Sequence, residues 1–346
     1  MSPLRNVPVI DIAPFLRGTD KIGVARAVDR ACRDIGFLVV GGHGVAAELI
    51  ERTRAAGRAF FDLPLADKIR VARPAPSVAR GYVGMEGESV ARSRDPTAQA
   101  GDLNESLMIG PVDLPPDEYA FAPEAGRHFA PNLWPAEPAD LRPAWTEYYR
   151  SMGRLSATLM RIFALGLGLQ ETYFDPMVDR HISRLRVRNY PAPVAPSQPG
   201  QIRAGAHSDY GSLTILCTED RPGGLQVFNA AGEWVDVPIV PDAFVVNIGD
   251  LMARWTNDAW VSTLHRVVNP PAGMEAESRR QSLVFFHNPN YDAPIACIPT
   301  CAANGDRPKY APTTSGEHLR KLFTTTQNVA WADPQTPAPH GGNDGA

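Results

Sequence analysis

The stretch that decides how this chain is interpreted is His207-Ser208-Asp209, followed later by His265 in an apolar context that includes Val267-Val268. In an extended strand successive side chains point to opposite faces, so His207 and Asp209 share a face and can hold one ion together. The apolar alternation around His265 predicts a second strand that brings this histidine to the same ion. Two imidazoles and one carboxylate on one side of an ion leave the other side open, which is the ligand set of non-haem Fe(II) sites.

A third motif, Arg280-Gln281-Ser282, lies on another predicted strand. Arg280 and Ser282 share a face of that strand, and the fork of a guanidinium is the side chain best shaped for a carboxylate. Taken singly, these residues have plainer explanations: His265 would more often be a core histidine, and Asp209 a turn residue. The three motifs in this order are far more specific than any one of them, and together they favour a metal site with an anion-binding strand beside it.

At these residues the chain resembles the isopenicillin N synthase-like group of iron and 2-oxoglutarate-dependent dioxygenases. The resemblance covers most of the chain and is carried by Val7-Pro8-Val9-Ile10-Asp11, Asp34-Ile35-Gly36-Phe37, Gly42-His43-Gly44-Val45, Arg80-Gly81-Tyr82, Asn189-Tyr190-Pro191 and residues 206–289. It implies that His207, Asp209 and His265 hold Fe(II). It also implies that Arg280, Ser282 and Tyr190 hold 2-oxoglutarate, with dioxygen as the other co-substrate.

Short strands separated by Gly and Pro are typical of a sandwich or barrel, and the resemblance implies a mostly β fold with flanking helices around a double-stranded β-helix, or jelly roll. The predicted strands include 213–217, 224–228, 233–237, 243–248, 263–268 and 282–287, and helices are predicted over 46–61 and within 138–169. We divide the chain into an α/β flank with an irregular substrate loop (1–137), a helix plus jelly-roll core that forms one compact unit with the flank (138–330), and a disordered tail (331–346).

The bulk composition favours a small-molecule substrate. The chain has 346 residues, 44% of them hydrophobic, and a formal net charge of −4, so it lacks the basic surface that nucleic acid requires. No apolar run approaches the length of a membrane span, and the start does not resemble an export signal, so we expect a cytoplasmic protein. The four cysteines show no metal-site pairing; Cys297 and Cys301 could approach one another, but reduced thiols are the better interpretation. The oligomeric state stays open.

Two groups of residues are candidates for substrate recognition. Alternation in the segment 184–190 places Arg186 and Arg188 on the strand face that carries Tyr190, which would favour an anionic substrate if that face lines the pocket. The alternative is a solvated outer face with a bulge before Tyr190. The region from about 72 to 138 is predicted to be irregular and contributes three further candidates, which could equally serve only the loop itself: Arg80, Tyr82 and Asn104.

The reaction that these motifs favour is oxidation of an unactivated C–H bond in a small, preferably anionic metabolite, with release of succinate and CO₂. Hydroxylation, desaturation and ring formation all remain open. One alternative is an oxidase like isopenicillin N synthase, which does not use 2-oxoglutarate and in which Arg280 and Ser282 would hold a substrate carboxylate. Another is a jelly-roll protein that binds a metal without redox chemistry, since zinc also accepts two histidines and a carboxylate. Such a protein has no need of Arg280-Gln281-Ser282.

Overall fold

The computed structural model describes residues 5–75, 78–93, 100–115, 117–193, 197–198, 200–302 and 307–327. The tail 331–346, for which the sequence predicts disorder, lies outside these residues. Among the helices of the described residues, none combines the length and the apolar character that a membrane span requires. All four cysteines, including Cys297 and Cys301, are free.

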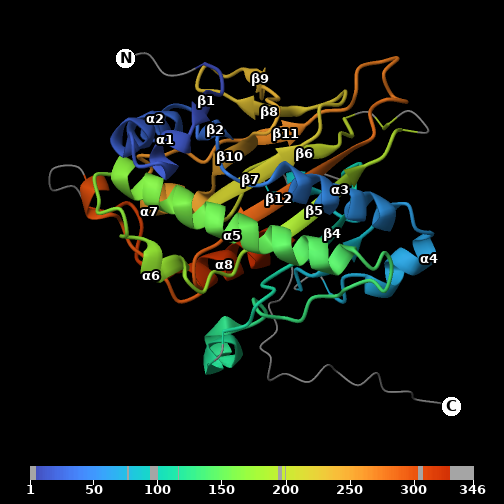
Figure 1. Ribbon diagram of the computed structural model, residues 1–346, viewed down its shortest axis with the longest axis horizontal. Helices are drawn as coiled ribbons and strands as arrows, with labels where there is room; N and C mark the ends of the chain where they lie inside the picture. Colours follow the sequence, from blue (N-terminus) through green and yellow to red (C-terminus); the bar gives the residue numbers. More distant parts are fainter. Residues whose placement is uncertain are drawn as a thin grey trace.

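Two β-sheets form the centre of the molecule (Figure 1). Within the described residues the large sheet has eight strands, in the order β1 (Val9–Asp11), β2 (Phe37–Gly41), β10 (Phe244–Ile248), β7 (Leu213–Thr218), β12 (Arg280–His287), β5 (Arg184–Tyr190), β4 (Glu105–Ile109) and β3 (Gly81–Val83). The small sheet has four strands, in the order β6 (Ala204–His207), β11 (His265–Val267), β8 (Leu225–Phe228) and β9 (Trp234–Asp236). The predicted fold class, mostly β with a jelly-roll core and flanking helices, is confirmed.

The large sheet has an inner face, which packs against the small sheet, and an outer face, which packs against helices. Phe37, Val245 and Tyr190 of the large sheet share one apolar cluster with Val227 and Val267 of the small sheet. This cluster holds the two sheets together, because apolar area removed from water stabilises the contact by about 25 cal/mol per Å². Polar groups that lie on the inner face are therefore enclosed between the sheets.

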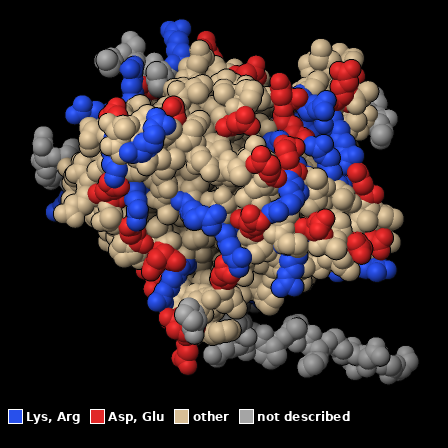
Figure 2. All heavy atoms as spheres, viewed as in Figure 1, with Lys and Arg blue, Asp and Glu red and all other residues tan. Residues whose placement is uncertain are grey.

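Helices cover the outer face of the large sheet. The long helix α5 (Leu141–Gly166) crosses it, with α2 (Lys21–Asp34) and α3 (Ala47–Phe61) packed alongside (Figure 1). The remaining helices are α1 (Ala13–Leu16), α4 (Leu65–Lys68), α6 (Asp175–Val178), α7 (Asp250–Trp255) and α8 (Ser315–Gln327). On the face shown in Figure 2 acidic and basic side chains are intermixed, and exposed pairs such as Arg161–Asp175 contribute little to stability.

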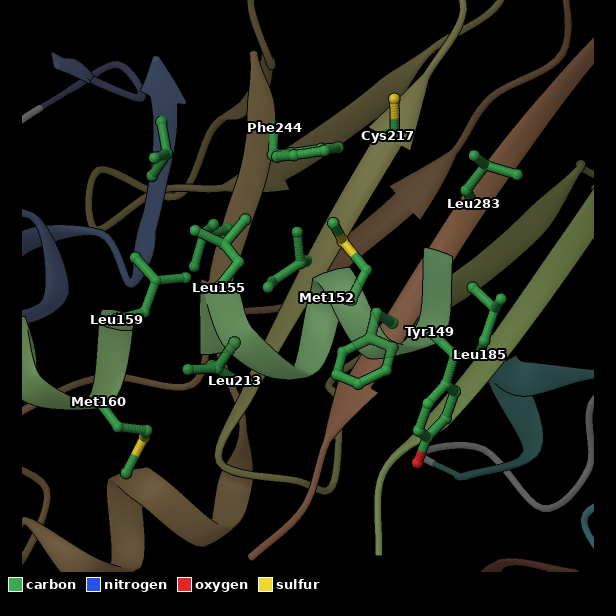
Figure 3. Packing of buried hydrophobic residues seen from close by; sticks show 14 of the residues in the cluster. Tyr149, Met152, Leu155, Leu159, Met160, Leu185, Leu213, Cys217, Phe244 and Leu283 are labelled. Atoms are coloured by element: carbon green, nitrogen blue, oxygen red, sulfur yellow. The ribbon is translucent and has the colours of Figure 1, made fainter. Parts of the chain in front are cut away.

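Helix α5 forms because its apolar residues recur at helical spacing, as the sequence predicts. Met152, Leu155 and Leu159 project from α5 into one buried cluster that also contains Leu213 and Leu283 of the large sheet (Figure 3). All five are buried. Burying a side chain of this size stabilises the fold by roughly 1.5–3 kcal/mol, so this row holds the helical layer on the strands that carry the candidate site.

Strand β5 is central to the site because all seven of its residues are buried. It pairs with β12 without interruption, from Arg280 opposite Tyr190 to Phe286 opposite Arg184. Leu185 belongs to the apolar cluster of the outer face, so by alternation the arginines and Tyr190 occupy the inner face. The alternative of a solvated face with a bulge is therefore wrong.

The region 72–138, expected to be irregular, contains strands β3 and β4, which extend the large sheet beyond β5. Helix α8 was not expected either. The sequence does not indicate strand β4 clearly because its first two residues, Glu105 and Ser106, are polar. Both find partners far away in the sequence: Lys68 pairs with Glu105 at 2.8 Å, and Arg186 donates to Ser106 at 3.0 Å.

The segment that precedes β4 is joined to the segment that leads into β6. The backbone N–H of Leu103 donates to the carbonyl of Ile202 at 3.2 Å. The buried carboxylate of Asp102 accepts from two backbone N–H groups, those of Val90 at 2.9 Å and Gly205 at 3.1 Å. Val90 and the segment 102–103 are thereby anchored to β6, on which His207 lies, and to the segment that precedes it.

Candidate metal centre

The structure brings His207, Asp209 and His265 together at one end of the space between the two sheets. His207 ends β6, His265 begins β11, and the two residues lie directly opposite one another in the antiparallel pair. Oδ1 of Asp209 lies 4.0 Å from Nε2 of His207 and 3.8 Å from Nε2 of His265. Among the described residues, this is the group of side chains arranged closely enough to hold a metal ion.

Hydrogen bonds fix which nitrogen of each imidazole is available. Nδ1 of His207 lies 2.8 Å from the carbonyl oxygen of Gly205, and Nδ1 of His265 lies 3.1 Å from that of Thr263. A carbonyl only accepts, so each Nδ1 carries the proton and each Nε2 presents its lone pair toward the centre. Metal-binding histidines usually have their second nitrogen held in this manner.

The carboxylate of Asp209 is oriented by two donors on the inner face. Thr214 Oγ1 donates to Oδ2 at 2.6 Å, and Asn247 Nδ2 donates to the same oxygen at 2.8 Å. Oδ1 is left to face the histidines. Asp209 is buried, which by itself would raise the pKa of its carboxyl, but the neighbouring His265 and His207 and these two hydrogen bonds lower it.

The protonation states suit a divalent cation. Burial and the neighbouring His265 lower the pKa of His207 to about 3, so its imidazole is neutral at neutral pH. A neutral imidazole and an ionised carboxylate are the forms that bind metals. The donor set of two nitrogens and one oxygen on one side of the centre fits Fe(II) with positions left for other ligands.

Arg280, Tyr190 and Ser282, the residues expected to hold 2-oxoglutarate, lie together on the inner face. Arg280 is opposite Tyr190 in the β5–β12 pair, and its Cζ lies 5.6 Å from the centre of the Tyr190 ring. Ser282 follows two residues later on the same face, opposite Arg188. The three side chains therefore form one row between the sheets.

Arg280 is 1% exposed and retains a donor that no described residue uses. It donates to the carbonyl of Gly223 at 2.6 Å and to Thr218 Oγ1, whereas its Nε is buried without a partner among the described residues. It also lines a cavity of about 380 Å³ between the sheets, bordered by Thr218, Leu225, Val245 and Val268. A carboxylate placed there would lie beside the guanidinium of Arg280.

The two arginines proposed for substrate differ in their surroundings. Arg186 forms a partly buried ion pair with Glu88, and Glu88 also pairs with Arg73. Burial would raise the pKa of Glu88, but Arg186, Arg73 and Arg188 together lower it to about 2. Arg188 donates to Asn104 Oδ1 at 3.1 Å. No carboxylate of the described residues lies within ion-pair distance of Arg188, although the charge of Arg188 partly offsets the rise that burial causes in the pKa of Asp102 and helps to lower the pKa of Glu88 and of the nearby His207.

Two of the residues predicted for substrate are not brought to the inner face. Tyr82 is opposite Leu107, which belongs to the outer-face cluster, and the Tyr82 hydroxyl donates to Glu105 at 2.5 Å. The guanidinium of Arg80 donates to the backbone carbonyls of Ala79, His128 and Ala130. Strand alternation directs Tyr82 to the outer face, and hydrogen bonds to backbone carbonyls hold Arg80 away from the inner face. We therefore leave both residues out of the substrate site.

Sequence reasoning missed several residues that support the centre. Thr214 and Asn247 contact Asp209 itself, whereas three others contact residues around the site: Glu88 pairs with Arg186, Asp102 accepts from Gly205, and Arg203 lies beside the ring of Tyr190. Thr214 offered one usable signal, because it is a polar residue on the inward side of an otherwise apolar strand. The others depend on partners distant in the sequence.

Two family models match the chain. Residues 7–137 match the family described as the N-terminal region of the non-haem dioxygenases in morphine synthesis, and residues 181–289 match the 2OG-Fe(II) oxygenase superfamily. A 2-oxoglutarate-Fe(II) type oxidoreductase of Emericella nidulans is 34% identical over 94% of this chain and 91% of the relative. Validamycin A dioxygenase of Streptomyces hygroscopicus subsp. limoneus is 32% identical over 91% of this chain and 85% of the relative.

Solved structures resemble the whole chain as well. A full-length Neurospora crassa protein, crystallised in complex with alpha-KG, aligns with a TM-score of 0.80 and 34% identity, covering 93% of this chain and 96% of that one. The same protein with alpha-KG and thymine aligns with a TM-score of 0.80. The alpha-KG of these complexes is 2-oxoglutarate, the co-substrate that the motifs of this chain indicate.

Proposed function

Because this chain belongs to the 2OG-Fe(II) oxygenase superfamily and is a 2-oxoglutarate- and Fe(II)-dependent oxygenase, we propose how its residues divide the work. His207, Asp209 and His265 hold iron. Arg280, Ser282 and Tyr190 hold 2-oxoglutarate. Iron and 2-oxoglutarate, when bound, supply the chemistry: dioxygen is activated, succinate and CO₂ are released, and an unactivated C–H bond of the substrate is oxidised.

The metal assignment rests on the directions of the three ligand atoms. Two Nε2 atoms and one Oδ1 atom face one point, and each ligand is held from behind by a carbonyl or by a pair of donors. Ligands that are oriented in advance need little rearrangement when the ion binds. The ring of Phe37 packs edge-on against His265 with 5.3 Å between the ring centres, which restricts water on that side.

The co-substrate assignment rests on Arg280, a buried cation that points into a cavity between the sheets. Its remaining donor, the hydroxyl of Ser282 and the phenol of Tyr190 offer a carboxylate several hydrogen bonds at once. A guanidinium and a carboxylate make one of the stronger pairs in proteins. The carboxylate of 2-oxoglutarate that is remote from iron would bind here.

For the substrate we propose a small molecule with a carboxylate or another strong acceptor, which Arg188 recognises. The carrying observation is that Arg188 faces the centre and makes no direct ion pair with a described residue, although Asp102 and Glu88 lie close enough to interact with its charge, whereas Arg186 pairs directly with Glu88. Asn104 orients Arg188 rather than binding substrate directly. Relatives act on or bind thymine and homoarginine, so members of this superfamily accept small polar molecules of different charge. Hydroxylation is the default outcome.

We also propose that the flank 1–137 and the core 138–330 form a single unit. Strand β2 of the flank pairs directly with β10 of the core, and β4 of the flank pairs with β5 of the core. Separating the two parts would leave these strand edges unpaired, which is costly inside a protein. The two parts are therefore expected to fold and unfold together.

The test is turnover of 2-oxoglutarate with Fe(II) and dioxygen, with succinate as the readout. Thymine, homoarginine, small carboxylates and amino-acid derivatives serve as probes, and a substrate is recognised by faster succinate formation with an equivalent amount of product. His265→Ala should lose both turnover and the binding of one Fe(II) per chain, whereas His43→Gln, at a histidine whose ring contacts the backbone of Asp242 and Val45, should keep both. Full turnover by His265→Ala would refute the metal assignment.

A further inference from the structure

The ring of Tyr190 has a second arginine beside it. Cζ of Arg203 lies 5.7 Å from the ring centre, nearly the same distance as that of Arg280. Arg203 is 2% exposed and belongs to the segment that leads into β6, so the two arginines reach Tyr190 from different sheets. A cation placed near the face of an aromatic ring is attracted by its electrons.

Neither arginine has an acidic partner within ion-pair distance among the described residues. Arg203 donates to the carbonyl of Pro222 at 3.0 Å, and to the carbonyl and hydroxyl oxygens of Ser278 at 2.7 and 2.9 Å. The partners of Arg280 are likewise neutral, a carbonyl and a hydroxyl. The space around Tyr190 therefore holds two positive charges whose direct partners, within the described part of the chain, are dipoles.

In the absence of an anion, the positive charges of Arg203 and Arg280 make the folded arrangement around Tyr190 less favourable in free energy. Burial lowers the pKa of Arg203 to about 10, with Arg280 contributing to the effect, and burial lowers the pKa of Arg280 as well. Both groups stay protonated at neutral pH. A buried charge without a counter-charge at ion-pair distance is unfavourable, and two like charges more so. Glu219 interacts with Arg280 but offsets its burial only in part. An anion placed beside Arg280 reduces both the cost of its buried charge and the repulsion between Arg280 and Arg203.

We propose that Arg203 supplies the second positive charge of the co-substrate site and that, acting through Tyr190 and through space, it selects a 2-oxo acid carrying a second carboxylate. The inference rests on the proposed role of Arg280. Arg280 binds the distal carboxylate directly, whereas Arg203 is a positioning residue that does not touch it. The preference for 2-oxoglutarate over a 2-oxo acid with an uncharged end then depends on both cations.

A purely structural role for Arg203 would depend on its hydrogen bonds instead of its charge. Those bonds hold Pro222 and Ser278, and the adjacent Gly223 carbonyl accepts from Arg280. The two roles separate cleanly by substitution. Arg203→Gln keeps an amide donor but removes the charge, whereas Arg203→Lys keeps the charge but loses the planar fork of donors.

The experiment is a direct binding titration of the full chain loaded with Fe(II) in the absence of dioxygen. The two probes are 2-oxoglutarate and 2-oxopentanoate, which has the same five-carbon skeleton without the distal carboxylate. The measured quantity is the ratio of their affinities, because a general loss of binding-competent protein cancels from it. Arg161→Gln, at an exposed residue paired with Asp175, is the matched control.

Arg203→Gln should lower the ratio by about 5- to 20-fold, the size expected for losing one charge several ångströms from a carboxylate in a partly desolvated site. Arg203→Met, measured beside it, should do the same. Arg203→Lys should lower the ratio by no more than about 3-fold. An unchanged ratio in the two neutral variants, or an equal loss in Arg203→Lys, would overturn the inference.

Arg280→Gln separates this inference from the function on which it rests. If Arg280→Gln leaves the ratio unchanged, the proposed co-substrate site is wrong, and the role of Arg203 is refuted with it. If Arg280→Gln abolishes the preference for 2-oxoglutarate but Arg203→Gln and Arg203→Met do not alter it, only the role of Arg203 is refuted. Thermal unfolding of each variant reports whether the fold is retained.

Discussion

Thr214 and Asn247 lie directly opposite one another on β7 and β10, and both donate to the same oxygen of Asp209. Two side chains of the large sheet thus orient Asp209, which follows strand β6 of the small sheet. Because Oδ2 of Asp209 accepts both hydrogen bonds, Oδ1 is the oxygen left to bind a metal. The geometry of the centre therefore depends on the register between two central strands.

Thr214→Val is expected to weaken Fe(II) binding by about 10- to 100-fold, the usual effect of removing a partner that orients a metal ligand. The substitution keeps the volume and shape of the side chain but removes the hydroxyl. An anaerobic Fe(II) titration measures the effect. Thr158→Val, on the exposed side of α5, is the control, and equal affinity in both variants would contradict the role of Thr214.

Arg188→Gln is expected to raise the apparent constant for a carboxylate substrate by roughly 10- to 100-fold, since it removes a charge-assisted hydrogen bond. The amount of product formed per succinate should fall at the same time, because a poorly bound substrate allows 2-oxoglutarate to be decarboxylated without oxidation of the substrate. The measurement compares succinate and product for the acid and its neutral ester. Equal coupling for acid and ester in the wild type would show that the substrate need not be an anion.

The partly buried pair between Glu88 and Arg186 predicts a pH dependence of stability. The folded-state pKa of Glu88 is lowered to about 2, whereas an unfolded Glu titrates near about 4.3. Its contribution is therefore complete above the unfolded pKa and is lost as the pH falls toward the folded pKa. Denaturant unfolding of the wild type should lose on the order of 2–3 kcal/mol from this group between about pH 5 and 2. Glu88→Gln should flatten that decline; an identical decline would contradict the prediction.

Lys68→Met is expected to destabilise the protein by about 3–5 kcal/mol, because it leaves the buried carboxylate of Glu105 without its cation. Lys68 Nζ lies 2.8 Å from Glu105, and both side chains are largely buried. The double variant Lys68→Met/Glu105→Gln should recover most of the loss, since no uncompensated charge remains. Urea unfolding measures both. Equal stability of the single and double variants would show that the ion pair is not responsible.

Much of the fold could be predicted because its signals are local. The strands predicted over 213–217, 224–228 and 282–287 correspond to β7, β8 and β12, and the predicted helix over 46–61 corresponds to α3, each within about two residues. The grouping of the three candidate ligands, His207, Asp209 and His265, agrees with the sequence prediction. The predicted reason holds only in part, because β6 ends at His207 and Asp209 lies beyond the strand instead of on its face.

The missed parts depend on partners that are far apart in the sequence. Strand β4 begins with polar residues that are stable there only because Lys68 and Arg186 meet them. The neutralisation of Arg186 by Glu88 links residues 98 positions apart, and no periodicity reports such a pairing. Arg203 could not be assigned either, since its importance comes from a ring and a second arginine that fold against it.

The two backbone donors that converge on Asp102 have a consequence for how this enzyme can change. A segment that replaces Asp102 and its neighbours in order to accept a new substrate must bring an acceptor of its own, or the buried backbone N–H of Gly205 loses its partner. Gly205 also accepts from His207. Substrate range and iron affinity are thus not independent traits of this chain, and exchanging loops between relatives should succeed only where a carboxylate is transferred with them.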